Sequence, residues 1–212
     1  MLTLWGAGTA RTIRAHWMLQ ELGLEYETKP VGSRTGETQE PTFQALNLKE
    51  KIPVLVDDDL VLTESGAIVT YLGTRYGQKS AQLGQPLVPT DPVQRARYDE
   101  WMSYILMELD AHTLYVLRKH RDLTALYGEA PAAVATAIDG FNKQIQFAVQ
   151  QLGQNSYALN EHFTGIDIML ATTLEWAVFY GFTLPETLES YRLRLREREG
   201  SRRAVLANRL PE

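Results

Sequence analysis

The chain contains no cysteine. It therefore forms no disulfide, no thiolate metal site and no cysteine nucleophile, and any thiol chemistry must use the thiol of a ligand. The sequence also lacks an apolar run of about 18 residues of the kind that spans a membrane, and residues 1–14 lack the apolar core of a signal peptide. These absences predict a cytoplasmic protein with no membrane partner.

Blocks of like charge are also missing. The formal net charge of -5 is spread along the 212 residues, and the one basic cluster, residues 192–203, is interrupted by Glu197 and Glu199. Such a mixed pattern is typical of a solvated helix face and argues against nucleic acid as a partner. We also predict no bound metal.

The first 77 residues alternate between strand and helix patterns. Apolar runs and turn residues predict strands, apolar residues at helical spacing predict helices, and the acidic turn at 57–59 predicts a hairpin. Ser65 is placed to cap the helix that follows it. The expected elements are strands at 2–5, 26–31, 52–56 and 60–62 and helices at 10–22, 41–46 and 65–77. This order is β-α-β-α-β-β-α.

The rest of the chain predicts helices only. Residues 78–90 are rich in Gly, Gln, Ser and Pro and show no periodicity, which is typical of a linker. A long helix is expected to begin at Pro92, and Thr164 and Asp167 form a capping-box pattern. Further helices are expected at 131–153, 164–179 and, as the last one, 185–198. We therefore expect domains at 1–77 and 91–212, joined by 78–90.

Several local motifs occur in an order and at spacings known from one family. They are Ile52-Pro53-Val54-Leu55, Glu64-Ser65-Gly66-Ala67-Ile68, the helix pattern from Arg14 to Glu27, and Thr164-x-x-Asp167. Together they resemble the cytosolic glutathione transferases, of bacterial type, across nearly the whole chain. Glu50 departs from the pattern, because some classes place a glycine or histidine there.

The resemblance implies an α/β thioredoxin-like domain followed by an all-α domain, arranged as a homodimer. It implies a glutathione transferase that conjugates the thiol of glutathione to small electrophiles in detoxification. Two alternatives stay open. One is a non-catalytic binding or interaction protein on the same scaffold, and the other is a glutathione-dependent isomerase, peroxidase or dehalogenase.

The resemblance also assigns residues to glutathione. Glu64 would accept the γ-glutamyl ammonium, while the hydroxyl and N–H of Ser65, at a helix N-terminus, suit the γ-glutamyl carboxylate. Taken alone, Glu64 is more simply interpreted as a solvent-facing acid, and Ser65 can cap the helix and bind the ligand at the same time. Lys51 and Gln39 are candidates for the glycyl carboxylate.

Pro53 is expected to follow a cis peptide bond. By resemblance, this turns the backbone of Ile52 so that its N–H and C=O pair with the cysteinyl residue of glutathione like an added strand. The alternative is an ordinary trans proline in an edge strand.

Thiol activation must supply a substantial free energy. To be mostly ionised at neutral pH, a thiol with a pKa of about 8.5 needs a decrease of about two units, or about 2.7 kcal/mol. A helix N-terminus supplies about 0.3–1 kcal/mol, so a donor to sulfur worth about 1.5–3 kcal/mol is also needed.

In the family that the chain resembles, a Tyr, Ser or Cys serves as the donor to sulfur at this place. No tyrosine precedes Tyr26 and the chain has no cysteine, so the resemblance implies a hydroxyl donor. We rank Thr9 first, Arg11 second as a positive charge and Thr12 third, with Ala10 offering only its backbone N–H. The alternative is that Thr9 merely caps the first helix.

The electrophile is expected to bind between the loop that contains Thr9 and the inner face of the helix that begins at Pro92. Tyr104, Glu108 and His112 fall at i, i+4 and i+8 on this helix. Their spacing would place them on one face. Nothing in the sequence identifies the electrophile.

Overall fold

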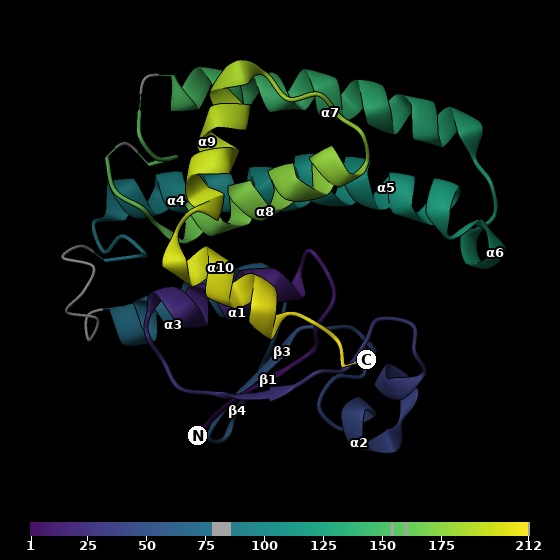
Figure 1. Cartoon of the computed structure of the whole chain (residues 1–212), viewed down its shortest axis with the longest axis vertical. Coiled ribbons are helices and arrows are strands. Elements are labelled where there is room, and N and C mark those ends of the chain that lie inside the picture. The colour runs from purple at the N-terminus through teal and green to yellow at the C-terminus, as the bar shows by residue number, and fades with distance from the viewer. Residues whose placement is uncertain (78–85, 154, 160, 212) are drawn as a thin grey trace. The chain divides into compact units, whose positions relative to one another are not determined.

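The computed structural model describes residues 1–77, 86–153, 155–159 and 161–211 (Figure 1). The chain forms two compact units, Met1–Val88 with Arg194–Glu212, and Pro89–Leu193. Most of the predicted linker, residues 78–90, lies outside the described residues. None of the helices in the described ranges is long and apolar enough to cross a membrane.

The first unit is built on a four-stranded sheet of order β2-β1-β3-β4. Strand β1 pairs with β2 in parallel and with β3 antiparallel, and β3 and β4 form the predicted hairpin. The strands are β1 (Leu2–Trp5), β2 (Glu27–Lys29), β3 (Val54–Asp57) and β4 (Leu60–Thr63). The helices of this unit are α1 (Thr12–Glu21), the 3-10 turn η1 (Glu37–Gln39), α2 (Pro41–Gln44), α3 (Ser65–Tyr76) and α10 (Glu199–Ala207). The β-α-β-α-β-β-α order is therefore confirmed.

Both faces of the sheet are covered. Leu4 is paired with Leu55 and Trp5 with Val54, so the two pairs point to opposite faces. The Trp5 face packs on α2, where Phe43 lies against Val54, and the other face lies toward α1 and α3 (Figure 1). The end of β1, the start of β3 and the end of β4 therefore lie side by side, and α1 and α3 begin after this edge of the sheet.

Helix α10 is absent from the sequence-based expectation, which ended the last helix at Arg198. In the structure α9 (Glu186–Arg196) stops earlier, and Arg198 has extended backbone angles, φ -61° and ψ 140°, at the N-cap of α10. An extended residue interrupts the helical hydrogen-bond ladder, so α9 ends and a second helix begins after it. This helix packs on α1.

The basic cluster at 192–203 is not a purely solvated face, which corrects the sequence-based interpretation. The side chain of Arg192 is 6% exposed and pairs with Glu175 at 2.7 Å and with Glu189. Arg198 donates to both carboxylate oxygens of Glu21, at 2.8 and 2.7 Å. Trp17 Nε1 donates to Glu21 Oε1 at 2.9 Å. The carboxylate of Glu21 therefore accepts from a residue of α1 and from the N-cap residue of α10.

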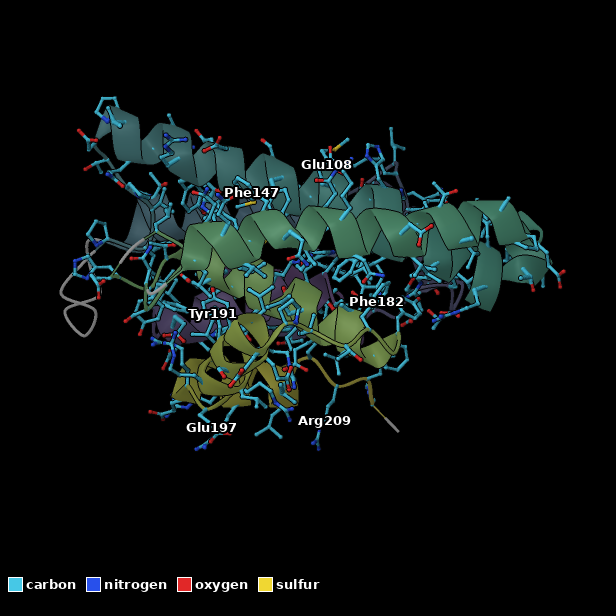
Figure 2. The ribbon with its side chains drawn as sticks, turned by 90° about the horizontal axis from the view of Figure 1, so that it is seen from above. Glu108, Phe147, Phe182, Tyr191, Glu197 and Arg209 are labelled. Atoms are coloured by element: carbon cyan, nitrogen blue, oxygen red, sulfur yellow. The ribbon has the colours of Figure 1, made fainter. Side chains whose placement is uncertain are left out.

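The second unit is helical in its described residues. The predicted long helix changes from α-helical to π-helical hydrogen bonding as it proceeds. The elements are α4 (Pro92–Tyr104), the π-helical segments η3 (Ile105–Leu114) and η4 (Arg118–Asp122), and helices α5 (Tyr115–Leu117), α6 (Thr124–Tyr127), α7 (Pro131–Leu152) and α8 (Gly165–Phe179), with α9 up to Leu193. Phe147 on α7 packs on Tyr104, with ring centroids 4.7 Å apart (Figure 2).

The capping box of α8 is confirmed. The Asp167 carboxylate accepts from the N–H of Thr164 at 2.7 Å, the N–H of Ala158 at 2.8 Å and the hydroxyl of Tyr191 at 2.7 Å. Burial raises the pKa of Asp167, and these donors oppose the rise. The network fixes the start of a helix whose residues are nearly all buried.

Candidate functional site

The loop before α1 brings Thr9 and Thr12 together. Thr9 Oγ1 accepts from the N–H of Thr12 at 3.0 Å and from the N–H of Arg11 at 3.3 Å. These two contacts use both lone pairs of Thr9 Oγ1, so the hydroxyl can form a further hydrogen bond only by donating its proton. Thr9 thus caps the first turn of α1 and remains a hydrogen-bond donor.

Thr12 is placed differently. Its side chain is buried, and Oγ1 lies 3.0 Å from Thr9 N, 3.0 Å from Thr9 Oγ1 and 2.6 Å from Asn208 Oδ1. Its hydrogen-bonding capacity is therefore used within the protein. Arg11 and Ala10 are both partly exposed at the start of α1.

The start of α3 joins Ser65 to a buried cation. Ser65 is buried, and its Oγ accepts from Nη1 of Arg14 at 3.2 Å. Arg14 is itself fully buried in α1. The sequence analysis treated Arg14 only as part of a motif, although an arginine among the apolar positions of a helix is a signal worth following. The N-cap of α3 is Glu64 rather than Ser65, which corrects the expected cap.

Glu64 has an unusual backbone, with φ 70° and ψ 117°. Residues other than glycine rarely adopt a positive φ. Holding a residue in such a conformation costs about 1–3 kcal/mol of folding free energy, and residues of this kind cluster at functional sites. Its carboxylate is 70% exposed and pairs with Lys49 Nζ at 2.6 Å. Lys49 was not among the predicted residues. An exposed pair of this kind is worth about 0–1 kcal/mol.

The loop before β3 contains the predicted cis proline, since the Ile52–Pro53 peptide bond is cis. Pro53 is buried, and Ile52 lies so close to Gly6 that a Cβ at Gly6 would be 2.6 Å from Ile52 Cβ. Asn47, which the sequence analysis did not single out, donates to Lys51 O at 2.7 Å and orients this loop.

Long exposed side chains surround the cis-proline loop. Both Lys51 and Gln39 are exposed. Glu50 has φ 54°, a backbone conformation that favours glycine. A glycine would adopt this conformation without strain. Gln44 Nε2 donates to Glu50 Oε1 at 2.7 Å.

The three residues predicted to bind the electrophile lie in the second unit. Tyr104 OH donates to Gln144 O at 2.7 Å, and burial raises the pKa of Tyr104. Glu108 (Figure 2) and His112 lie in η3, where π-helical hydrogen bonds run from i to i+5. The turn is wider than in an α-helix, but residues four apart still lie near one face of the helix. Their role stays a prediction.

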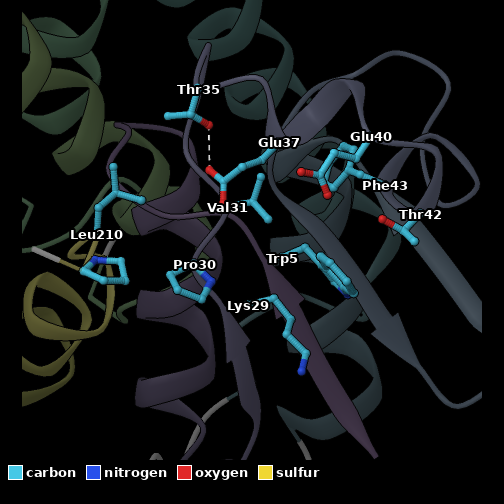
Figure 3. Close-up of a pocket in the computed structure, with 11 residues that line it drawn as sticks. Trp5, Lys29, Pro30, Val31, Thr35, Glu37, Glu40, Thr42, Phe43 and Leu210 are labelled. Atoms are coloured by element: carbon cyan, nitrogen blue, oxygen red, sulfur yellow. Dashed lines mark hydrogen bonds between the residues drawn. The ribbon is translucent and has the colours of Figure 1, made fainter.

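A pocket of about 540 Å³ lies beside the sheet in the first unit (Figure 3). Trp5 and Phe43 form its apolar part, and Glu37 and Lys29 contribute charged groups. Its lining includes no residue of the predicted glutathione-binding set, although Leu210 from the C-terminal segment takes part. Among the described residues, no group of three or more His, Asp or Glu is arranged to hold a metal ion.

A buried histidine supports the strand that leads into the Thr9 loop. His16 Nε2 lies 3.2 Å from Gly6 O, and Nδ1 lies 2.8 Å from Tyr26 OH. A carbonyl oxygen only accepts, so Nε2 carries the proton and Nδ1 accepts from Tyr26. Burial lowers the pKa of His16 to about 4.

Acid should therefore destabilise the protein through His16. Because the folded pKa lies below the unfolded value of about 6.5, the unfolded chain binds the proton more tightly, and stability is lost as the pH falls from 6.5 toward 4. We expect a loss of about 2 kcal/mol between pH 7 and pH 5 from this residue. Urea unfolding at both pH values, on the wild type and His16→Gln, measures it. An equal pH dependence in the two proteins would refute the assignment.

The fold is a thioredoxin-like domain followed by a helical domain. Residues 1–74 match the N-terminal domain model of the glutathione S-transferases, and residues 131–202 match the C-terminal domain model. The chain belongs to the cytosolic glutathione S-transferase family.

Individual relatives agree with this assignment. Glutathione S-transferase D7 of Drosophila melanogaster is 30% identical over 185 residues, which cover 86% of this chain and 78% of that protein. Glutathione S-transferase GstA of Escherichia coli O157:H7 is 26% identical and covers 95% and 96%. A theta class glutathione S-transferase of Xanthomonas axonopodis pv. citri, solved with glutathione bound, has a TM-score of 0.80 at 29% identity over 97% of both chains.

Proposed function

We propose that this protein binds glutathione and conjugates it, through its thiolate sulfur, to a small electrophile. In this step the sulfur forms a bond to an electrophilic carbon, and a leaving group departs with the bonding pair or the electrons move onto the acceptor. The observation that carries the proposal is the Thr9 hydroxyl, which accepts two backbone N–H groups at the start of α1 and keeps its proton to donate.

The γ-glutamyl end is assigned to the start of α3. The hydroxyl and N–H of Ser65 receive the carboxylate, and the positive charge of buried Arg14 lies directly behind that hydroxyl. When glutathione binds, the carboxylate of Glu64 breaks its exposed ion pair with Lys49 and pairs with the ammonium group of the ligand instead. Because the pair with Lys49 is weak, this exchange costs little.

The rest of the tripeptide is assigned to the cis-proline loop. Ile52 pairs through its backbone with the cysteinyl residue, and exposed Lys51 and Gln39 receive the glycyl carboxylate. The Ala10 N–H lies beside Thr9 in sequence and adds a donor near the sulfur. The glutathione bound in the theta class relative supports this choice of ligand.

Activation of the thiol needs about 2.7 kcal/mol. A donated hydrogen bond from Thr9 to the charged sulfur supplies about 1.5–3 kcal/mol, and the N-terminus of α1 adds about 0.3–1 kcal/mol. The positive charge of Arg11 lowers the thiol pKa further. The sum meets the requirement without a tyrosine or cysteine.

Family membership also supports a homodimer in the cytoplasm with a role in detoxification, which we include in the proposal. Rates with a chloronitroaromatic, an isothiocyanate, an organic hydroperoxide and maleylacetoacetate would rank conjugation against peroxidase and isomerase activity. Faster turnover of the hydroperoxide or of maleylacetoacetate than of the first two would replace conjugation as the main reaction.

Glutathione titration calorimetry tests the binding half of the proposal. We expect measurable binding by the wild type and about tenfold weaker binding by Ser65→Ala, because one hydrogen bond to a charged carboxylate is lost while the backbone N–H remains. Ser103→Ala is the matched control, since its exposed hydroxyl donates to Asp99 O within α4. Absent binding by the wild type would leave an interaction protein as the better interpretation.

A further inference from the structure

The C-terminal segment reaches the loop that carries the proposed thiol donor. Asn208 is the C-cap of α10 and makes three hydrogen bonds to that loop. Its carbonyl oxygen accepts from Gly8 N at 2.7 Å, its Oδ1 accepts from Thr12 Oγ1 at 2.6 Å, and its Nδ2 donates to Thr9 O at 3.2 Å. One residue near the end of the chain therefore contacts three residues of the loop.

These contacts fix the orientation of the Asn208 amide. A backbone carbonyl can only accept, so the group facing Thr9 O must be the NH2. The carbonyl oxygen of the amide then faces Thr12. The Thr12 hydroxyl has two acceptors in reach, Thr9 O at 3.0 Å and Asn208 Oδ1 at 2.6 Å, and the shorter contact directs its single proton to Asn208. A flipped amide would place two acceptors, or two donors, against each other.

The direction of the Thr12 proton has a consequence for Thr9. With its proton committed to Asn208, Thr12 Oγ1 acts only as an acceptor toward Thr9, from which it lies 3.0 Å away. Thr9 Oγ1 already accepts from two backbone N–H groups. The Thr9 hydroxyl is therefore the donor of this contact, and its proton points to Thr12 Oγ1 in the absence of a ligand. A charged sulfur is a stronger acceptor than a hydroxyl and would replace Thr12 as the acceptor of this proton when glutathione binds.

Helix α10 is tied to α1 at both of its ends. Its N-terminal end is attached through Arg198 and Glu21, near the end of α1, and its C-terminal end through Asn208, at the start of α1. Gly200 allows the close packing, since a Cβ there would lie 2.7 Å from the Glu21 carboxylate carbon. At the other end, Leu210 would lie 3.0 Å from a Cβ at Gly8.

We propose that Asn208 is a positioning residue for thiol activation, which acts by holding Thr9 and Thr12 in the arrangement that makes Thr9 a donor, so that its hydroxyl proton turns from Thr12 to the sulfur when glutathione binds. This inference rests on the proposed function. It assigns a role in the reaction to the C-terminal segment. Asn208 itself does not contact the sulfur in this scheme.

The test uses the full-length protein and two variants. Asn208→Ala removes both side-chain hydrogen bonds, and Asn208→Asp keeps the acceptor for Thr12 but replaces the donor to Thr9 O with a negatively charged oxygen. Both keep the main-chain bond to Gly8. Leu206→Ala, at an exposed position of α10, is the control for general effects on the helix.

The measurements are the pH profile of kcat/KM, the ultraviolet absorbance of the bound thiolate and the KM for glutathione. We expect the thiol pKa to rise by about one unit in Asn208→Ala and by more in Asn208→Asp, with a roughly tenfold lower thiolate fraction at neutral pH. The KM for glutathione should change little, because the residues assigned to its two ends are untouched. Leu206→Ala should match the wild type.

If the wild type shows the thiolate signal and the thiol pKa is unchanged in both variants, the role of Asn208 is overturned and the activation mechanism is not. A wild type that binds glutathione but shows no thiolate below a pH of about 8 would instead refute the activation mechanism itself. If Asn208→Ala does not fold, Asn208→Asp decides the question. A rise in KM with an unchanged pH profile would show a purely structural role and would also overturn the inference.

Discussion

Replacement of Arg198 by alanine is expected to lower the free energy of unfolding by about 3–5 kcal/mol, because it leaves a buried carboxylate without its cation. The Glu21 side chain is 6% exposed and receives both of its charged hydrogen bonds from Arg198. Among the contacts of the described residues, Trp17 Nε1 then remains as a neutral donor to this carboxylate. Chemical denaturation at neutral pH, monitored by tryptophan fluorescence, measures the loss.

The matched control for this variant lies on the same helix. Arg203 pairs with Glu199 one turn apart, and both side chains are exposed. Exposed pairs of this kind contribute about 0–1 kcal/mol, so Arg203→Ala should be close to the wild type. Equal losses in the two variants would mean that Arg198 stabilises α10 through its charge alone and that burial of Glu21 is unimportant.

Replacement of Thr9 by valine should lower kcat/KM by about 10- to 150-fold, which corresponds to the loss of one hydrogen bond to a charged sulfur. Valine keeps the shape of threonine but has no proton to donate. The thiol pKa in the kcat/KM profile should rise in parallel. Stability should fall by about 1 kcal/mol, because Thr9 also caps the first turn of α1.

Thr9→Ser separates the catalytic and capping roles. Serine keeps the hydroxyl, so this variant should retain most of the activity, whereas a fall as large as that of valine would point to the methyl group and to packing. Thr136→Val is a control, since its exposed hydroxyl only donates to Ala132 O within α7. If Thr9→Val keeps wild-type kcat/KM, the activation must come from Arg11 and backbone N–H groups.

Local patterns predicted the elements of the first unit well. Two apolar runs on either side of a turn of three aspartates are sufficient for a hairpin, and the cis bond before Pro53 followed from the motif around it. These features depend on residues close in sequence. The start of α3 was less accurate, because the positive φ of Glu64 moved the cap by one residue.

The contacts that sequence reasoning missed join distant residues. Arg198 and Glu21 are 177 positions apart, and Thr12 and Asn208 are 196 apart. A basic cluster with interspersed glutamates has the composition of a surface, and only the packing of α10 on α1 shows which of its arginines are buried. The change to π-helical hydrogen bonding in η3 likewise has no simple signature in residue spacing.

The division of the chain between its two units also sets an order of completion during synthesis. Residues 89–193 form one uninterrupted stretch, whereas the first unit needs residues 194–212 as well. Because the chain is synthesised from its N-terminus, the sheet and α1 leave the ribosome early. Their contacts with α10 form only after residues 199–207 have been synthesised. Until then the carboxylate of Glu21 and the groups of the Thr9 loop remain hydrated. The proposed thiol site is therefore among the last parts of the molecule to be assembled.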